Sequence, residues 1–243
     1  MLYYRCSIFG RNTPVRNTEH KSNRRNRFFF LGNQVALDFL NTRPVQDGRQ
    51  LELLPDFGAL LGWFEAAGLL QSREVAALRQ KWHRSKRAQQ TTAAMRQLRE
   101  KLREQVVAWE NGGRVRLSTL RELNRVMAAH PMRTRLKAEG KSLSTELWFE
   151  AREPEDLFAP LAHSAAALFA ATDRNCVRKC AQCVLHFQDT SKKGTRRWCS
   201  MRLCGNQLKV AAYAARRRQE RAASQSYLIT KKSPMPSASM PAQ

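Results

Sequence analysis

Cys180-Ala-Gln-Cys183 and Cys199-Ser-Met-Arg-Leu-Cys204 are two closely spaced cysteine pairs, separated by fifteen residues. Each short spacer lets both thiolates of a pair turn toward one ion, and four thiolates complete the tetrahedral coordination of Zn²⁺. A site with four sulfur ligands has no open coordination position, so we expect one structural zinc rather than a catalytic one. Cys176 and His186 are the neighbouring residues that could compete for the metal. Buried unbound cysteines and a redox-active C-x-x-C pair are the alternative interpretations.

The segment around these cysteines is strongly basic. Residues 174–221 hold thirteen lysines and arginines but only two acids, Asp189 and Glu220. A segment of this size and charge buries too little apolar surface to fold alone, and metal binding would supply the missing free energy. Phe187 and Trp198 are the residues that we expect to pack beneath the zinc, together with Leu185 and Leu203.

The basic residues of this segment fall in a loop before Cys199 and on an amphipathic helix after Gly205. Lysine and arginine along such a surface bind phosphates and release counterions, which gives affinity without sequence preference. Asn206, Gln207 and Arg202 are the candidate base readers, because asparagine and glutamine pair with adenine and arginine pairs with guanine. The alternative is a solvated helix whose last arginines offset the helix dipole. The expected nucleic-acid contacts are Lys192, Lys193, Arg196, Arg197, Arg202, Asn206, Lys209, Arg216 and Arg217.

The middle of the chain, residues 28–173, is different because its charges nearly balance and its apolar residues follow helical spacing. Capping residues and glycines predict where these helices begin and end. Alternation and the turn at Gly140 predict a β-hairpin over 133–150. The expected helices cover residues 55–68, 72–88, 92–111 and 154–171, with a further one that ends before Pro131. Trp63 is expected on the flank of the first helix's apolar stripe. Thr119 and Glu122 would form a capping box for the helix before Pro131, and the last helix would kink or restart at Pro160.

The apolar run Phe28–Leu40 fits either a short strand or a first buried helix. Four polar residues close this run: Asp38, Asn41, Thr42 and Arg43. They form a possible ligand pocket, and the alternative is that they cap the helix and satisfy its backbone ends. The expected fold is therefore mainly α with a small β-hairpin: a helical N-terminal domain, then a treble-clef-like or ribbon-type zinc finger that ends in a basic helix.

The two ends of the chain differ in composition from both domains. Residues 1–27 are basic and aperiodic, which predicts a flexible arm, and residues 223–243 are of low complexity, which predicts a disordered tail. The domains are thus expected at 28–173 and 174–222. No stretch reaches 18 uncharged apolar residues, and the N-terminus lacks a secretory leader, so we expect a cytoplasmic protein in which cysteines bind metal.

Two sets of residues resemble a known family. Phe187-Gln188-Asp189-Thr190-Ser191, Arg196–Met201 and Cys204-Gly205-Asn206, together with the cysteine pairs, resemble the CGNR zinc-finger family, although Gln207 stands where that family's motif has arginine. Members of that family usually carry an N-terminal ABATE domain, linked to stress-induced transcription regulation. Leu37-Asp38-Phe39-Leu40-Asn41-Thr42 and Leu60–Leu70 are similar to the opening of that domain. The resemblance implies a zinc finger behind a regulatory domain.

The formal net charge of +23 and the metal site together predict a zinc-dependent, DNA-binding transcription regulator. Its N-terminal domain would sense a small-molecule effector or form a homodimer. In a bacterium the protein would associate with the nucleoid. An RNA-binding or ribosome-associated protein is the alternative, because charge alone does not separate DNA from RNA. We expect no enzymatic activity, since His83, His130 and His163 are scattered along helices without ligand spacing. A protein–protein adaptor would show no salt-dependent nucleic-acid binding.

Overall fold

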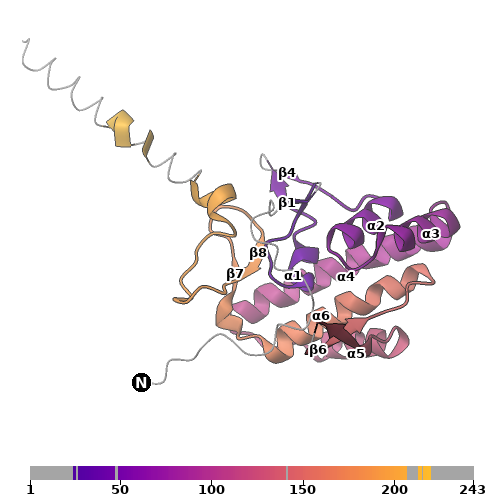
Figure 1. Ribbon diagram of the computed structural model, residues 1–243. Helices are drawn as coiled ribbons and strands as arrows, with labels where there is room; N and C mark the ends of the chain where they lie inside the picture. The colour runs from indigo at the N-terminus through magenta and orange to yellow at the C-terminus, as the bar shows by residue number, and fades with distance from the viewer. Residues whose placement is uncertain are drawn as a thin grey trace, which may run out of the picture. The chain divides into compact units, whose positions relative to one another are not determined.

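Helices make up most of the computed structural model, which describes residues 24–25, 27–46, 49–140, 142–206, 213–214 and 216–219 (Figure 1). The chain forms two compact units, Met1–Cys199 and Ser200–Gln243. The expected C-terminal tail, most of the N-terminal arm, Gln207 and Lys209 lie outside the described residues. In the described part of the chain, no helix is long and apolar enough to cross a membrane.

The apolar run Phe28–Leu40 forms both of the expected structures. Strand β1 (Arg24–Arg25) pairs with β2 (Phe28–Phe29), and helix α1 (Val35–Leu40) follows. Gly32 makes the tight turn between β2 and α1. A Cβ at this position would lie 2.6 Å from the Cβ of Leu37, and the Gly32 N–H donates to Asp38 Oδ1 at 2.7 Å. The turn directs Leu37 and Leu40 into the core, where both are buried.

Helix α2 (Phe57–Ala66) lies within the predicted range 55–68 and is two residues shorter at each end. Asp56 accepts a hydrogen bond from the N–H of Ala59 at 2.7 Å, and Gly68, with φ of +75°, ends the helix in the left-handed region. The expected position of Trp63 is wrong, because this side chain is fully buried rather than on the flank. Its ring packs against Phe64 of the same helix and against Phe30 and Phe39. Helical spacing alone does not reveal that the segments of Phe30 and Phe39 meet α2.

The boundary between the next two helices differs from the prediction. Helix α3 (Ser72–Trp82) is shorter than expected, and helix α4 (Lys86–Glu110) begins earlier, because the Ser85 hydroxyl caps it through the N–H of Ala88. Helix α5 (Leu117–Ala129) has no side-chain cap, so the predicted Thr119/Glu122 capping box is wrong. Thr119 instead donates to Gln105 on α4, and Glu122 pairs with Lys101.

The predicted β-hairpin is confirmed as strands β5 (Arg133–Glu139) and β6 (Ser142–Trp148). A further hairpin, which the sequence analysis did not predict, joins β3 (Val45–Gln46) to β4 (Arg49–Gln50). The last long helix follows a 3₁₀ turn at Pro154–Leu157, and α6 runs over Phe158–Ala171. It restarts two residues before Pro160, which lies in its first turn, where a missing N–H costs little.

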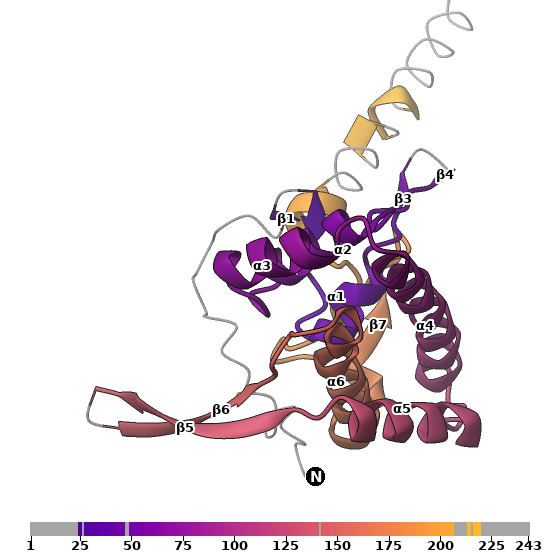
Figure 2. The same cartoon turned by 90° about the vertical axis from the view of Figure 1, so that its right-hand side faces the viewer.

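Helix α1 lies at the centre of this arrangement, packed against α4 and α6, while α5 packs on α6 (Figure 2). Two clusters of buried apolar side chains surround α1, one toward α2 and α3 and one toward α5 and α6. Strands β7 (Val177–Lys179) and β8 (His186–Gln188) form a hairpin, and β8 packs against α1. The mainly helical fold with small hairpins is therefore confirmed.

Candidate metal centre and nucleic-acid interface

The two cysteine pairs come from two different local structures. Cys180 and Cys183 lie in the connection between β7 and β8, which the Cys180 N–H closes by donating to Leu185 O at 2.9 Å. Cys199 precedes a helical turn, Met201–Gly205, that carries Cys204. The Ser200 hydroxyl begins this turn by accepting from the N–H groups of Arg202 and Leu203. The two cysteine pairs thus lie in a hairpin connection and at a helical turn, and the type of zinc finger, treble-clef-like or ribbon, stays a prediction.

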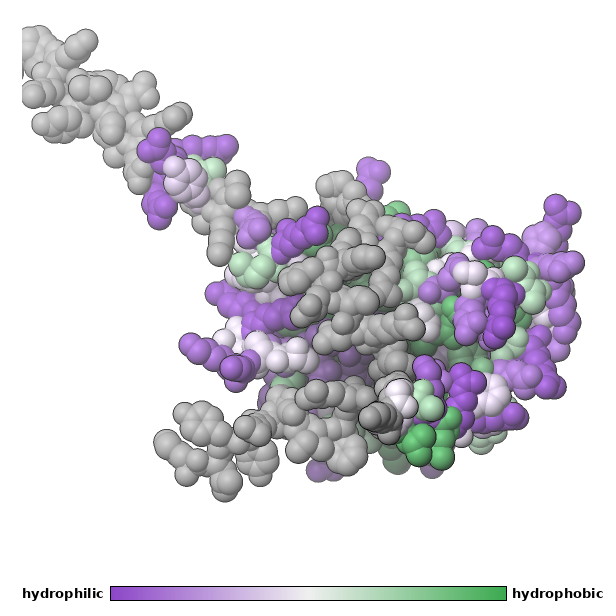
Figure 3. All heavy atoms as spheres, viewed as in Figure 1, coloured by the Kyte–Doolittle hydropathy of each residue, from purple (hydrophilic) through white to green (hydrophobic). Residues whose placement is uncertain are grey.

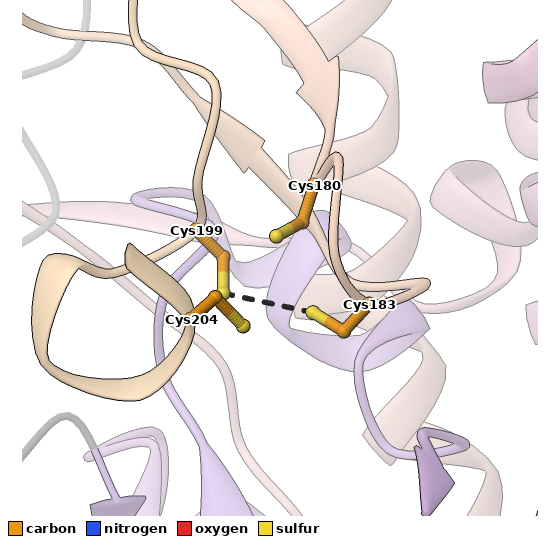
Figure 4. Close-up of side chains that lie close together, drawn as sticks. All are labelled: Cys180, Cys183, Cys199 and Cys204. Carbon is orange, nitrogen blue, oxygen red and sulfur yellow. Dashed lines mark hydrogen bonds between the residues drawn. The ribbon is translucent and has the colours of Figure 1, made fainter. Parts of the chain in front are cut away.

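All four cysteines point toward one another (Figure 4). Their sulfur atoms lie within 4.8 Å of one another, and the Sγ atoms of Cys183 and Cys199 are 3.7 Å apart. A tetrahedral zinc with bonds of about 2.3 Å separates its sulfur ligands by about 3.8 Å, so the donor set fits this ion. Cys176 and His186 are not members of the cluster. The four thiolates therefore form one closed structural zinc site.

Phe187 forms the apolar base of this region, as expected, and is fully buried with Leu185 beside it. Trp198 is only half-buried, which corrects the expectation that it would be a core residue. The reason lies in Arg196, whose guanidinium covers the Phe187 ring at 4.6 Å and donates to the carbonyls of Trp198 and Cys199. An arginine thus occupies part of the space that we expected tryptophan to fill.

The loop between β8 and Cys199 is held from beneath by one carboxylate. Asp189 is 1 % exposed and accepts hydrogen bonds from the N–H groups of Ser191 at 2.9 Å and Arg196 at 2.8 Å. Burial alone would raise its pKa, but these hydrogen bonds and the nearby Arg178 outweigh burial and lower the pKa. Arg178 also donates to the carbonyl of Gly194, where φ is +58°. These hydrogen bonds therefore hold the loop in one conformation.

Lys192, Lys193 and Arg197 are exposed on this loop, and Arg197 lies over the Trp198 ring at 5.1 Å. Arg196 is held by its hydrogen bonds to the chain, which favours a positioning role over a nucleic-acid contact. The remaining expected contacts that the structure describes are exposed side chains of the second unit: Arg202, Asn206, Arg216 and Arg217.

The possible ligand pocket formed by Asp38, Asn41, Thr42 and Arg43 stays a prediction, and the contacts of these side chains favour the structural alternative. Asn41 is fully buried and exchanges two hydrogen bonds with the backbone of His186, at 2.9 and 2.8 Å. Thr42 accepts from Arg99 at 2.9 Å, and Arg43 pairs with Glu100. A cavity of about 310 Å³ lies elsewhere, between α4, α5 and α6.

Sequence reasoning missed a polar pair formed by His186, buried on β8, and Glu110, half-buried at the end of α4. His186 Nε2 lies 3.8 Å from Glu110 Oε2, and within the described chain neither His186 ring nitrogen has a hydrogen-bond partner. Burial raises the pKa of Glu110 to about 7, although nearby Lys179 opposes it. Burial, with Arg103 and Lys179, lowers the pKa of His186 to about 4. No sequence signal points to this pair, because 76 positions separate the two residues.

Comparison with known families agrees with this geometry. Residues 33–172 match the ABATE family, described as "Putative stress-induced transcription regulator", and residues 176–217 match the CGNR zinc finger. A comparison with curated protein sequences finds no significant match to the chain. The ABATE match covers more than half of the chain, and its order before the zinc finger agrees with the resemblance noted from the sequence. The chain belongs to the ABATE family, and it carries a CGNR zinc finger with four cysteine ligands.

Proposed function

We propose that this protein is a zinc-dependent DNA-binding transcription regulator, active in the cytoplasm at the nucleoid and without enzymatic activity. The observation that carries the proposal is the loop after β8. Three exposed cations, Lys192, Lys193 and Arg197, stand on a loop fixed by Asp189 and by the zinc cysteines. A fixed cationic loop meets phosphates at a smaller entropic cost than a flexible one.

The charge distribution supports a nucleic-acid partner over an acidic protein surface. The basic segment 174–221 has two acids, and Asp189 is buried beneath the loop, where it does not repel a phosphate from solvent. The exposed side chains of Arg202 and Asn206 are of the types that discriminate bases. Within the basic segment, Tyr213 is 56 % exposed, whereas Phe187 is buried and Trp198 is half-buried with Arg197 over its ring. Stacking on a single strand needs exposed rings, so this segment supports duplex DNA over single-stranded RNA.

The test is the salt dependence of DNA binding by the loop variant Lys192→Ala/Lys193→Ala/Arg197→Ala. If the three side chains contact phosphates, the slope of log K against log salt falls by about 2 to 3, and affinity near physiological salt falls about 10- to 100-fold. The matched control is Arg73→Ala/Arg84→Ala/Lys86→Ala, which removes the same charge from exposed positions of the helical domain.

Fluorescence anisotropy with one labelled duplex measures both variants across a salt series. We expect the control variant to keep the wild-type slope of log K against log salt, and the loop variant to have the reduced slope. Equal slopes in the wild type and the loop variant would contradict the proposed interface. Tighter binding to a matched RNA than to DNA, with the same loop dependence, would replace DNA with RNA as the partner.

A further inference from the structure

The β5–β6 hairpin stands away from the helices that carry it (Figure 2). It is a two-stranded sheet in the described chain, so each strand has one partner and one open edge. An isolated two-stranded hairpin is marginally stable in water, and independent stability needs further strands or a packed face. The hairpin therefore lacks part of the structure that would stabilise it.

The two faces of the hairpin differ in chemistry. One face is apolar and open to solvent: Leu136 is 71 % exposed and Leu143 is 72 % exposed, with Leu147 beside them on the same face. Hydrophobic side chains also gather on the visible surface over this hairpin (Figure 3). The other face is basic, and Arg133 and Arg135 lie over the Trp148 ring. The exposed leucines lie on the opposite face from these arginines and Trp148.

The open edge of β6 presents its backbone groups at alternate residues. Two residues separate Glu139 from Ser142, which makes them the first hydrogen-bonded pair of the hairpin. The backbone groups of Leu143, Thr145 and Leu147 therefore point away from β5, toward the open edge. These are also the residues whose side chains lie on the apolar face.

We propose that β6 pairs with β6 of a second copy of this chain, antiparallel and centred on Thr145. In this register Leu143 faces the partner's Leu147, Thr145 faces the partner's Thr145, and Glu146 faces the partner's Ser144. Leucine pairs and a threonine pair are favourable cross-strand neighbours, and no like charges meet. The four-stranded sheet that results uses every outward backbone group of the central strands.

The edge of β5 does not offer the same pairing. Pairing two copies of β5 about Leu136 would place Arg135 opposite the partner's Lys137, and directly opposed like charges are destabilising. Basic residues along an edge are also a common way to prevent strand pairing. The charge pattern of the hairpin therefore selects β6 as the interface between copies.

The first test substitutes proline for the central residue of the interface and measures the mass of the full-length chain by light scattering. Thr145→Pro removes an outward N–H that the hairpin itself does not use, so the hairpin folds while its edge is blocked. Leu136→Pro, at the matching position of the β5 edge, is the control. We expect the wild type and Leu136→Pro to have twice the 27.9 kDa chain mass, and Thr145→Pro to have the chain mass.

A charge exchange tests the register. Leu143→Lys/Leu147→Lys places lysine opposite lysine and gives a monomer, whereas Leu143→Lys/Leu147→Glu places lysine opposite glutamate and restores the dimer. A monomeric wild type, or a dimer that persists in Thr145→Pro, overturns the proposal. A monomer that loses DNA affinity on Arg133→Ala/Lys137→Ala also overturns it and assigns the hairpin to nucleic acid. The mass measurements need no DNA, so their failure is distinct from failure of the proposed function.

Discussion

Asn41 is the buried side chain that hydrogen-bonds the helical domain to strand β8, beside the contacts that Asn33 and Gln34 make with Gln188. Its amide exchanges two hydrogen bonds with the backbone of His186 in a fully buried position. Asn41→Ala would leave a buried N–H and a buried carbonyl without partners, and we expect it to cost about 2 to 3 kcal/mol of unfolding free energy. Urea unfolding measures the change, with Asn124→Ala, exposed on α5, as the control. A variant as stable as the control would contradict a structural role for Asn41.

The raised pKa of Glu110 makes the stability of the fold depend on pH. Its folded pKa of about 7 exceeds the ordinary value of 4.5, so the folded state binds the extra proton and stability falls as pH rises through this range. Glu110→Gln removes this penalty. We expect its stability gain over the wild type to grow by about 1 to 2 kcal/mol from pH 5 to pH 8, after discounting for solvent screening.

Urea unfolding of both proteins at several pH values checks this prediction. His186, whose folded pKa of about 4 lies below 6.5, acts in the opposite sense, because it destabilises the fold as pH falls from 6.5 to 4. Taking the difference between Glu110→Gln and the wild type removes most of the His186 contribution. A difference that is the same at pH 5 and pH 8 would show that Glu110 ionises normally in the folded protein.

At the scale of elements, the zinc and the packing of β8 on α1 stabilise different parts of the finger. Cys199→Ser removes one ligand, and we expect it to abolish the one bound zinc per chain. Hydrogen exchange should then accelerate over residues 180–204, while helices α2 to α6 keep their protection, because their core is separate from the cysteines. Unchanged exchange near the cysteines, with zinc lost, would contradict a structural metal.

The elements also divide by what the sequence could predict. Cysteine spacing predicts the metal ligands because coordination geometry is local, and helical spacing predicts α2, α4 and α6. The capping of α5 and the burial of Trp63 escaped prediction because distant residues decide them: Gln105 takes the Thr119 hydroxyl, and three rings from two other segments and α2 enclose Trp63. Buried polar contacts such as Asn41 with His186 leave no periodic signal.

At the scale of the whole molecule, a helical ABATE domain precedes a zinc finger whose loop after β8 carries exposed cations. The balanced charge of residues 28–173 and the excess of base over acid in 174–221 are the reasons for placing the proposed polyanion binding on the finger. Pairing of two copies through β6 would bring two fingers into one complex, and paired modules bind a duplex with higher effective affinity than one alone.

Selection from a random duplex-DNA pool near physiological salt, with zinc present and then chelated, tests zinc-dependent recognition of DNA sequence. We expect a sequence motif to be enriched with zinc and lost on chelation, because the ion fixes the loop that meets the DNA. Enrichment that survives chelation would contradict zinc-dependent recognition. Salt-sensitive binding with no enriched motif would contradict a sequence-reading regulator and leave a binder of the phosphate backbone.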